Sequence, residues 1–464
     1  MTLRVAALLV VLAAVARSEP PVPAGAAWNV VLISLDTLRA DHMTCYGYAR
    51  RTTPNLDGLA ARGVVFENAI AASSWTVPSH MSLFTGLYPS AHGVESVRLA
   101  LDRKAVTLAE ALRARGWKTA AFVSGPSLNG QMGFSRGFET YDDFTVTLSH
   151  EANLLGYNDV ENMSINQIVT NPIITRLATD WLRKNAGTRF FLFLHYWDVH
   201  HDYIPPAPYD RAFDPGYVGS VDGRNIGGRQ KQWERDGLAP ADLAHLAALY
   251  DGEIAHTDAH VGAVLRVLEE TRLTERTLVI IVSDHGEAFM EHGRLNHGNS
   301  LHDELVRVPL ILCAPTLVPA GRRLDGYVSH VDVMPTVLGL LQLAPPGPVQ
   351  GVDLSPALRG TVAATDRLVF SELNYVEHSL RAVRCRQGTL IVDLHGRDPE
   401  RWLRPDAARW IAAGPGDFDE GLAGRMREAA AKGPARPDAV VLTPEKPPAN
   451  PQLLERLKSL GYVQ

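Results

Sequence analysis

The sequence predicts an α/β fold with a largely parallel central sheet flanked by helices. Two apolar runs carry this prediction, Asn29 to Asp36 and Thr277 to Asp284. Each run is rich in β-branched residues and too short for a typical helix, which indicates a strand buried on both faces of a parallel sheet. Each run ends in an aspartate, and open α/β sheets bind their ligands at the carboxyl ends of their strands.

Length and composition agree with a large globular protein. The 464 residues suffice for one large domain and a smaller one, and 46% of them are hydrophobic against 21% charged. The net charge of -6 gives no reason to expect a nucleic-acid partner. The three cysteines are too few for a disulfide framework in a chain of this length.

The first residues have the pattern of an export signal. An apolar run follows Arg4 and ends in small residues at Ala16, and it is too short to span a bilayer. We therefore expect residues 1–16 to be a signal peptide and residues 17–27 to be a linker. The mature protein should then be exported, either periplasmic or secreted, with no stable membrane span. An uncleaved N-terminal anchor is the alternative.

Further helices and strands alternate along the chain. Helices are predicted over 54–62, 107–115, 173–184 and 239–272, and strands over 118–123, 189–195 and 308–313. The helix at 107–115 begins with a capping box, because Thr107 is followed by Glu110 three residues later. These elements predict a main domain over residues 28–350.

The chain changes character after about Asp353. Short alternating strands between 368 and 392 predict a small α+β subdomain over residues 351–464. Residues 407–437 match no pattern, and residues 453–463 are predicted to form a short amphipathic helix.

A candidate nucleophile lies in the segment Ser74 to Gly86, which has the pattern of a loop that turns into a helix. Pro78 suits a first helical position, because its missing N–H would have no partner there. Thr76 then lies just before the helix, where unpaired N–H groups and the positive end of the helix dipole attract anions. A hydroxyl at that position is a plausible nucleophile, although a simple N-cap is the alternative.

These segments together resemble the sulfatase family of the alkaline phosphatase superfamily. The matching residues occur in the family's order between Asn29 and Leu341, and they are Asp36 in LDTLRADHMTCYGY, TTPNLD at 52–57, TVPSHMSLFTG at 76–86, Tyr88-Pro89, His92-Gly93, SDHG at 283–286 and Arg307-Val308-Pro309. The resemblance implies an alkaline-phosphatase-like fold and an ester hydrolase that acts on a small-molecule, lipid or glycan ester.

The sequence departs from the family where its nucleophile is made. Sulfatases carry a Cys or Ser that is oxidised to formylglycine, and an Arg four residues later; here these positions are Thr76 and His80. Threonine cannot become an aldehyde by that oxidation, so the chain is similar to the family's members that use threonine itself. Gly298 also stands where sulfatases place a sulfate-binding lysine.

The resemblance implies one divalent metal, held by Asp36, Asp284, His285 and the Thr76 oxygen. This mixed set of ligands suits Mn²⁺ or Zn²⁺ better than the Ca²⁺ that is usual in sulfatases. Thr37 also stands where many sulfatases place a second aspartate ligand, which weakens the case for Ca²⁺ further. Ordinary capping by Asp284 is the alternative.

Two more histidines are candidates for the chemistry. His200 and His297 are expected to contact the substrate anion or to protonate the leaving group, and they join Thr76 and His80 as catalytic candidates. For His200, a loop histidine bonded to a nearby carbonyl is the alternative. His201 and Asp202 are additional polar groups that could contribute to a second metal site.

Three functions are open on this sequence. The first is a phosphoester hydrolase or phosphotransferase with Thr76 as its nucleophile, acting on a diester or a phosphonate-like ester. The second is a sulfuric ester hydrolase, similar to an arylsulfatase, that works without formylglycine. The third is an inactive binding protein, and the intact set of metal ligands argues against it.

Overall fold

The computed structural model describes residues 28–143, 169–362, 367–406, 409–435 and 442–447. The predicted signal peptide, the predicted linker and the predicted helix over residues 453–463 lie outside these ranges. Among the described residues, no helix combines the length and the apolar character needed to cross a membrane.

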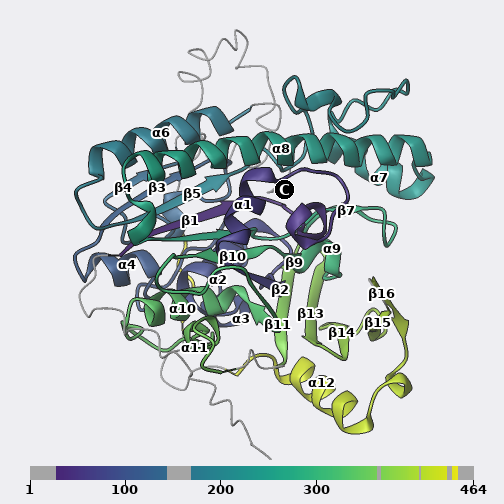
Figure 1. The fold of residues 1–464 in the computed structure, drawn as a ribbon. Helices are drawn as coiled ribbons and strands as arrows, with labels where there is room; N and C mark the ends of the chain where they lie inside the picture. Colours follow the sequence, from purple (N-terminus) through teal and green to yellow (C-terminus); the bar gives the residue numbers. More distant parts are fainter. Residues whose placement is uncertain (1–27, 144–168, 363–366, 407–408, 436–441, 448–464) are drawn as a thin grey trace, which may run out of the picture.

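A nine-stranded sheet forms the centre of the molecule (Figure 1). Its strand order is β11-β2-β10-β6-β1-β5-β3-β4, and β9 pairs with β2 beside this path. The strands are β1 (Asn29–Leu35), β2 (Val64–Ile70), β3 (Lys118–Val123), β4 (Thr140–Asp142), β5 (Phe190–Tyr196), β6 (Thr277–Val282), β9 (Arg307–Val308), β10 (Leu310–Cys313) and β11 (Arg322–Ser329). Only β9 and β10 run antiparallel to their neighbours, so the largely parallel sheet is confirmed.

Strand β1 lies in the middle of the sheet and is buried on both faces. It pairs in parallel with β5 on one side and with β6 on the other. Its side chains alternate between two cores: Val30 and Leu32 belong to one hydrophobic cluster, and Val31 and Ile33 belong to the other. This alternation is the geometric consequence of the two-residue period of a strand, and it explains why the run is apolar throughout.

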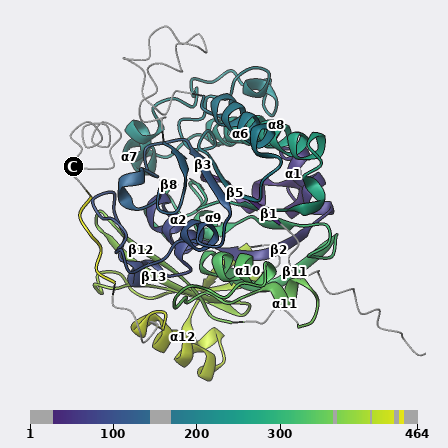
Figure 2. The same cartoon turned by 90° about the vertical axis from the view of Figure 1, so that its left-hand side faces the viewer.

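Helices cover both faces of the sheet (Figures 1 and 2). One face packs against α1 (Pro54–Ala61), α6 (Asn171–Asn185) and the long α8 (Pro240–Glu270). The other face packs against α2 (Thr76–Thr85), α4 (Leu108–Arg113) and α10 (Val333–Leu340). The shorter elements are α3 (Pro89–His92), α7 (Ile226–Asp236), α9 (Asp303–Val306), α11 (Ser355–Leu358), β7 (Ala288–Phe289) and β8 (Leu295–Asn296).

The C-terminal region forms a five-stranded antiparallel sheet with one helix against it. Its strands follow one another in chain order as β12 (Val369–Tyr375), β13 (His378–Cys385), β14 (Gly388–Asp393), β15 (Arg401–Asp406) and β16 (Arg409–Ala413). The helix α12 (Glu420–Lys432) packs on this sheet through Leu422 and Met426. The region 407–437, which matches no sequence pattern, therefore contains a regular strand and helix.

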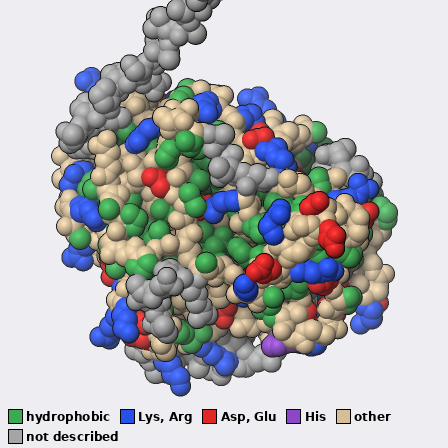
Figure 3. Space-filling model, turned by 90° about the horizontal axis from the view of Figure 1, so that it is seen from below, with side chains coloured by type: hydrophobic (Ala, Val, Ile, Leu, Met, Phe, Trp, Pro, Cys, Tyr) green, Lys and Arg blue, Asp and Glu red, His purple; other side chains and the backbone are tan. Residues whose placement is uncertain are grey.

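On the face shown in Figure 3, the basic and acidic side chains of the described residues lie interspersed.

The start of α2 differs from the sequence expectation. The helix begins at Thr76 rather than at Pro78, and extended Trp75 is its N-cap, with φ −156° and ψ 160°. Pro78 is tolerated at the third position because the first four N–H groups of a helix have no partner within it. The capping box at α4 is confirmed: Glu110 N donates to Thr107 Oγ1 at 3.1 Å, and Thr107 N donates to Glu110 Oε2 at 2.8 Å.

We expect Phe193→Ala to destabilise the fold strongly. Phe193 is fully buried on the strand next to β1, and its ring meets that of Phe84 on α2 at a centroid distance of 4.8 Å. Removing such a ring should cost about 3–5 kcal/mol of unfolding free energy, measured by urea denaturation. The control is Val218→Ala, at a side chain that is 97% exposed, and it should change this free energy by less than about 0.5 kcal/mol. Equal stability of the two variants would contradict this description of the core.

Candidate functional site

The predicted metal ligands meet at the carboxyl edge of the central sheet. Asp36 directly follows β1, and Asp284 and His285 follow the neighbouring β6. Thr76, the first residue of α2, faces the same place and is 1% exposed. Two adjacent parallel strands and one helix start therefore bring together residues that lie far apart in the sequence.

The distances between these side chains suit a cation site. Thr76 Oγ1 lies 3.3 Å from His285 Nε2, which in turn lies 3.4 Å from Asp284 Oδ2 and 3.8 Å from Asp36 Oδ1. Those two carboxylate oxygens are buried and have no hydrogen-bond partner among the described residues. Burying such oxygens unpaired is costly, and a divalent cation between them would remove that cost. The residues present therefore fit the metal that the sequence predicts.

Charge coupling between these residues changes their pKa values. Burial, followed by the charge of Asp284, raises the pKa of Asp36 well above its ordinary range. Burial would also raise the pKa of Asp284, but the imidazoles of His285, His80 and His195 outweigh it and lower that pKa to about 2. Without a cation, the cluster thus retains protons that metal binding must displace, so we expect metal affinity to fall as pH falls.

Hydrogen bonds orient the ligand atoms toward the centre of the site. His285 Nδ1 donates to Gly286 O at 2.9 Å, so the lone pair of the neutral ring lies on Nε2. Asp284 Oδ1 accepts from Thr37 N at 3.2 Å and from His285 N at 2.9 Å, which turns Oδ2 toward His285 and Asp36. Thr37 has φ 56°, a left-handed conformation that is strained for a β-branched residue. Thr37 therefore contributes a backbone N–H to Asp284, at the position where many sulfatases have a second aspartate ligand.

His80 lies one helical turn below Thr76 and is fully buried. Its Nδ1 donates to Thr76 O at 3.0 Å and lies 3.4 Å from Asp284 Oδ2, while Ser34 Oγ donates to its Nε2 at 2.9 Å. Burial lowers its pKa to about 3, so the ring is neutral. With both nitrogens engaged, His80 is placed to hold Thr76 and Asp284 rather than to reach a substrate as the family's arginine would.

His195 was not among the residues that the sequence singled out. Its Nε2 lies 3.2 Å from Asp36 Oδ2, and its Nδ1 donates to Ser124 O at 2.7 Å. The residue lies on β5, directly opposite Ser34 of β1. A histidine inside an otherwise apolar strand was the available signal, but only the strand pairing shows that it faces Asp36.

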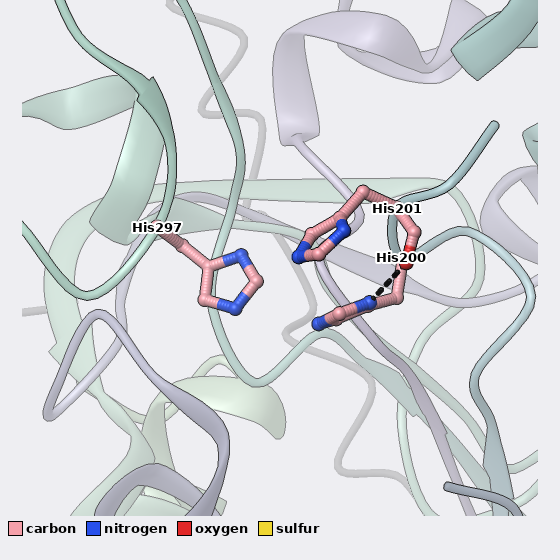
Figure 4. A group of neighbouring side chains, drawn as sticks. All are labelled: His200, His201 and His297. Carbon is pink, nitrogen blue, oxygen red and sulfur yellow. Dashed lines mark hydrogen bonds between the residues drawn. The ribbon is translucent and has the colours of Figure 1, made fainter. Parts of the chain in front are cut away.

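His200, His201 and His297 form a second cluster beside the first (Figure 4). His200 and His201 follow β5, and His297 follows the β7–β8 hairpin. The ring centroids of His200 and His297 are 4.8 Å apart, and those of His285 and His297 are 4.5 Å apart. The predicted catalytic histidines are therefore adjacent to the predicted metal ligands.

Two carboxylates beside this cluster have different roles. Glu287, which sequence analysis did not assign, accepts from His297 Nδ1 at 3.0 Å, and burial raises its pKa to about 7. Asp202, by contrast, accepts from the backbone of Asn225 at 2.7 Å and of Ile226 at 2.8 Å. Asp202 is thus committed to the start of α7, and the suggestion that it serves a second metal gains no support from its contacts.

Comparison with known proteins identifies related chains. The family model described as Sulfatase matches residues 28–343. The uncharacterized sulfatase YidJ of Escherichia coli (strain K12) is 26% identical over 352 residues, which cover 70% of each chain. The multifunctional alkaline phosphatase superfamily protein PehA of Trinickia caryophylli is 27% identical, over 71% of this chain and 77% of its own. The phosphonate monoester hydrolase of Agrobacterium radiobacter has a similar fold, with a TM-score of 0.69 and 21% identity over 81% of this chain and 89% of its own.

We expect Asp284→Asn to preserve the fold and to lose the metal bound at this centre, with most of the activity. The amide oxygen can still accept the two backbone N–H groups, but the variant lacks one of the two carboxylate charges. Metal content after dialysis, measured by inductively coupled plasma mass spectrometry, checks this alongside circular dichroism. The control is Asp180→Asn, at an exposed residue of α6, which should keep the wild-type metal content. Unchanged metal content in Asp284→Asn would place the site elsewhere.

Proposed function

The chain belongs to the sulfatase family of ester hydrolases in the alkaline phosphatase superfamily, and we propose that it cleaves phosphoesters with Thr76 as its nucleophile. The observation that carries this proposal is the position of Thr76 Oγ1. This hydroxyl is buried at the start of α2, 3.3 Å from His285 Nε2 and next to the carboxylates of Asp36 and Asp284. A hydroxyl that only capped the helix would not need an imidazole and two carboxylates beside it.

The roles of the residues follow from this placement. When bound by Asp36, Asp284 and His285, a divalent cation lowers the pKa of a coordinated hydroxyl and polarises the substrate oxygen. Thr76 Oγ attacks phosphorus as its proton passes to the neutral ring of His200 or His297. The bond to the leaving alcohol breaks, and the same ring gives that proton to the alcohol. Water, or an acceptor alcohol, then attacks phosphorus and releases Thr76. The metal is Mn²⁺, Zn²⁺ or Ca²⁺, and the first two suit the mixed ligands best.

The single oxygen of threonine favours phosphate over sulfate. A formylglycine diol that has attacked sulfur can expel sulfate by collapsing to the aldehyde, so no water needs to attack the sulfated enzyme. Thr76 has no such exit, and a sulfated Thr76 would tend to stall after one turnover. A phosphorylated Thr76 can be cleaved at phosphorus by water or an alcohol.

The charge of the site favours a monoanionic substrate. The positions of the family's motif arginine and of one sulfate-binding lysine hold His80 and Gly298, and His80 is neutral and hydrogen-bonded inside the protein. Little fixed positive charge therefore faces the substrate when one cation is bound, so a phosphodiester or phosphonate monoester suits this site better than a dianionic monoester.

A sulfuric ester hydrolase that works without formylglycine is the second candidate. It is favoured by the names of curated relatives, which include the human arylsulfatase A, 28% identical over 82% of this chain and 76% of its own. The substrate class is a small-molecule, lipid or glycan ester in either case. With the predicted signal peptide over residues 1–16, the enzyme acts outside the cytoplasm.

We expect Thr76→Ala to abolish phosphodiester turnover. Loss of a nucleophile should lower the rate about a thousandfold or more, whereas Thr76→Ser retains a hydroxyl and should keep measurable activity. Aryl phosphodiester, phosphomonoester and sulfate esters are assayed with each of the three metals. The control is Thr85→Ala at the other end of α2, where the hydroxyl donates to Met81 O, and it should stay active. Many turnovers of the sulfate ester, lost in Thr76→Ala and without phosphodiester activity, would overturn the proposal.

A further inference from the structure

Two histidines and one glutamate form a cluster at the tip of the β7–β8 hairpin, and none of them belongs to the candidate site. His292 lies in the turn of the hairpin, His302 precedes α9, and Glu304 is the second residue of that helix. One ligand atom of each residue lies within 4.8 Å of the other two. On a tetrahedral zinc, two imidazole nitrogens with Zn–N bonds of about 2.1 Å lie about 3.4 Å apart. Small side-chain movements would therefore bring the three atoms onto one ion.

The buried carboxylate of Glu304 lacks a partner from any other residue. Its side chain is 8% exposed, and apart from its own backbone N–H no donor among the described residues hydrogen-bonds to it. His292 Nε2 is 3.7 Å from Glu304 Oε2, which is beyond hydrogen-bond reach. Burial raises the pKa of this carboxyl to about 7. A buried carboxylate in this state is costly, and a cation between it and the two imidazoles would offset the cost.

Ser300 orients the ring of His302 as a ligand. His302 is buried, and its Nδ1 lies 2.6 Å from Ser300 Oγ. When Nδ1 donates to this hydroxyl, the lone pair of the neutral ring lies on Nε2, and no hydrogen bond among the described residues occupies that nitrogen. Burial lowers the pKa of His302 to about 3, so the ring is neutral as a metal ligand must be.

His292 completes the set from the hairpin turn. Its ring is stacked on that of His302, with a centroid distance of 3.8 Å and an interplanar angle of 18°. Two stacked rings cannot both direct a lone pair at the same ion, so one of them must turn. His292 is free to do so because its side chain is 41% exposed, whereas Ser300 holds the ring of His302.

A pocket of about 570 Å³ gives access to this cluster. It lies between the hairpin and the C-terminal sheet, and both histidines of the cluster form part of its wall. Two arginines near the cluster are paired with carboxylates of their own, Arg401 with Asp398 at 2.7 Å and Arg384 with Asp303 at 3.2 Å. An ion can therefore reach the cluster from solvent, and the positive charge around it is already balanced.

We propose that His292, His302 and Glu304 bind a transition-metal cation that joins the tip of the β7–β8 hairpin to the start of α9. Two imidazoles and one carboxylate, with a fourth position open to the pocket, suit Zn²⁺ better than Ca²⁺ or Mg²⁺. The hairpin has only two residue pairs, and a ladder this short has little stability of its own. Glu287 and His297 flank its two strands and bond to each other beside the candidate site. The ion thus holds the hairpin that positions His297, and it takes no part in bond cleavage.

The metal content of variants tests this site by difference. Chelator-treated full-length protein is dialysed against Zn²⁺, and bound zinc per chain is counted by mass spectrometry, with circular dichroism as the check on folding. His292→Ala, at an exposed side chain, should bind one ion fewer than wild type, and so should His302→Ala. Glu304→Gln should weaken this ion about tenfold or more. The control His395→Ala, at an exposed residue after β14, should bind as many ions as wild type.

Hydrogen exchange of the hairpin separates this ion from the one at the candidate site. In wild type, Zn²⁺ at about ten times its dissociation constant should slow exchange of the backbone N–H groups of residues 288–296 about tenfold. The same slowing is expected in Asp284→Asn, which lacks only the ion at the candidate site, and should be absent from His292→Ala. Wild-type zinc content in His292→Ala, slowing that persists in that variant, or no slowing in wild type would overturn the proposal. None of these results alters the expectation for Thr76→Ala.

Discussion

Two buried carboxylate oxygens, Asp36 Oδ1 and Asp284 Oδ2, lie beside His285 Nε2. Neither oxygen has a hydrogen-bond partner among the described residues. The free energy of such an arrangement is favourable only when protons or a cation offset the repulsion. The neighbouring groups are arranged around this constraint. His195 faces Asp36, His80 faces Asp284, and the strained Thr37 gives its N–H to Asp284. Each of these contacts fixes a carboxylate in place, so the helix start that carries Thr76 meets a site that is already organised.

The fold supplies this organisation through strand adjacency. β1 and β6 are neighbours in parallel register, so the residues that follow them lie side by side at one edge of the sheet. β5 adds His195 from the other neighbour of β1, and it leads directly into His200 and His201. The second histidine cluster is therefore a continuation of the same edge, and Glu287, three residues beyond Asp284, connects the two clusters through His297.

Sequence reasoning predicted the parallel sheet and several of its helices, and the structure brings together the four residues that it assigned to the first site. These residues could be singled out because each stands at the end of an apolar run or at a helix start, where local pattern and chemistry coincide. It did not find His195 or Glu287, since their roles depend on strand register and on a hairpin that returns to the site. It placed the helix start at Pro78 because proline is common at a first position, whereas the buried packing of the whole of α2 sets the start at Thr76. For Asp202, which the sequence offered as a possible contributor to a second metal site, the structure shows a carboxylate that accepts backbone N–H groups at the start of α7.

The most direct test of the central claim is to identify the covalent intermediate. The metal-loaded enzyme is mixed with an aryl phosphodiester, quenched in acid within one turnover, and digested for high-resolution mass spectrometry of the peptide that contains Thr76. The account predicts a phosphoryl group with its remaining ester substituent on Thr76, present in wild type and absent from Thr76→Ala. Turnover with no adduct on that peptide, or an adduct on another residue, would contradict it.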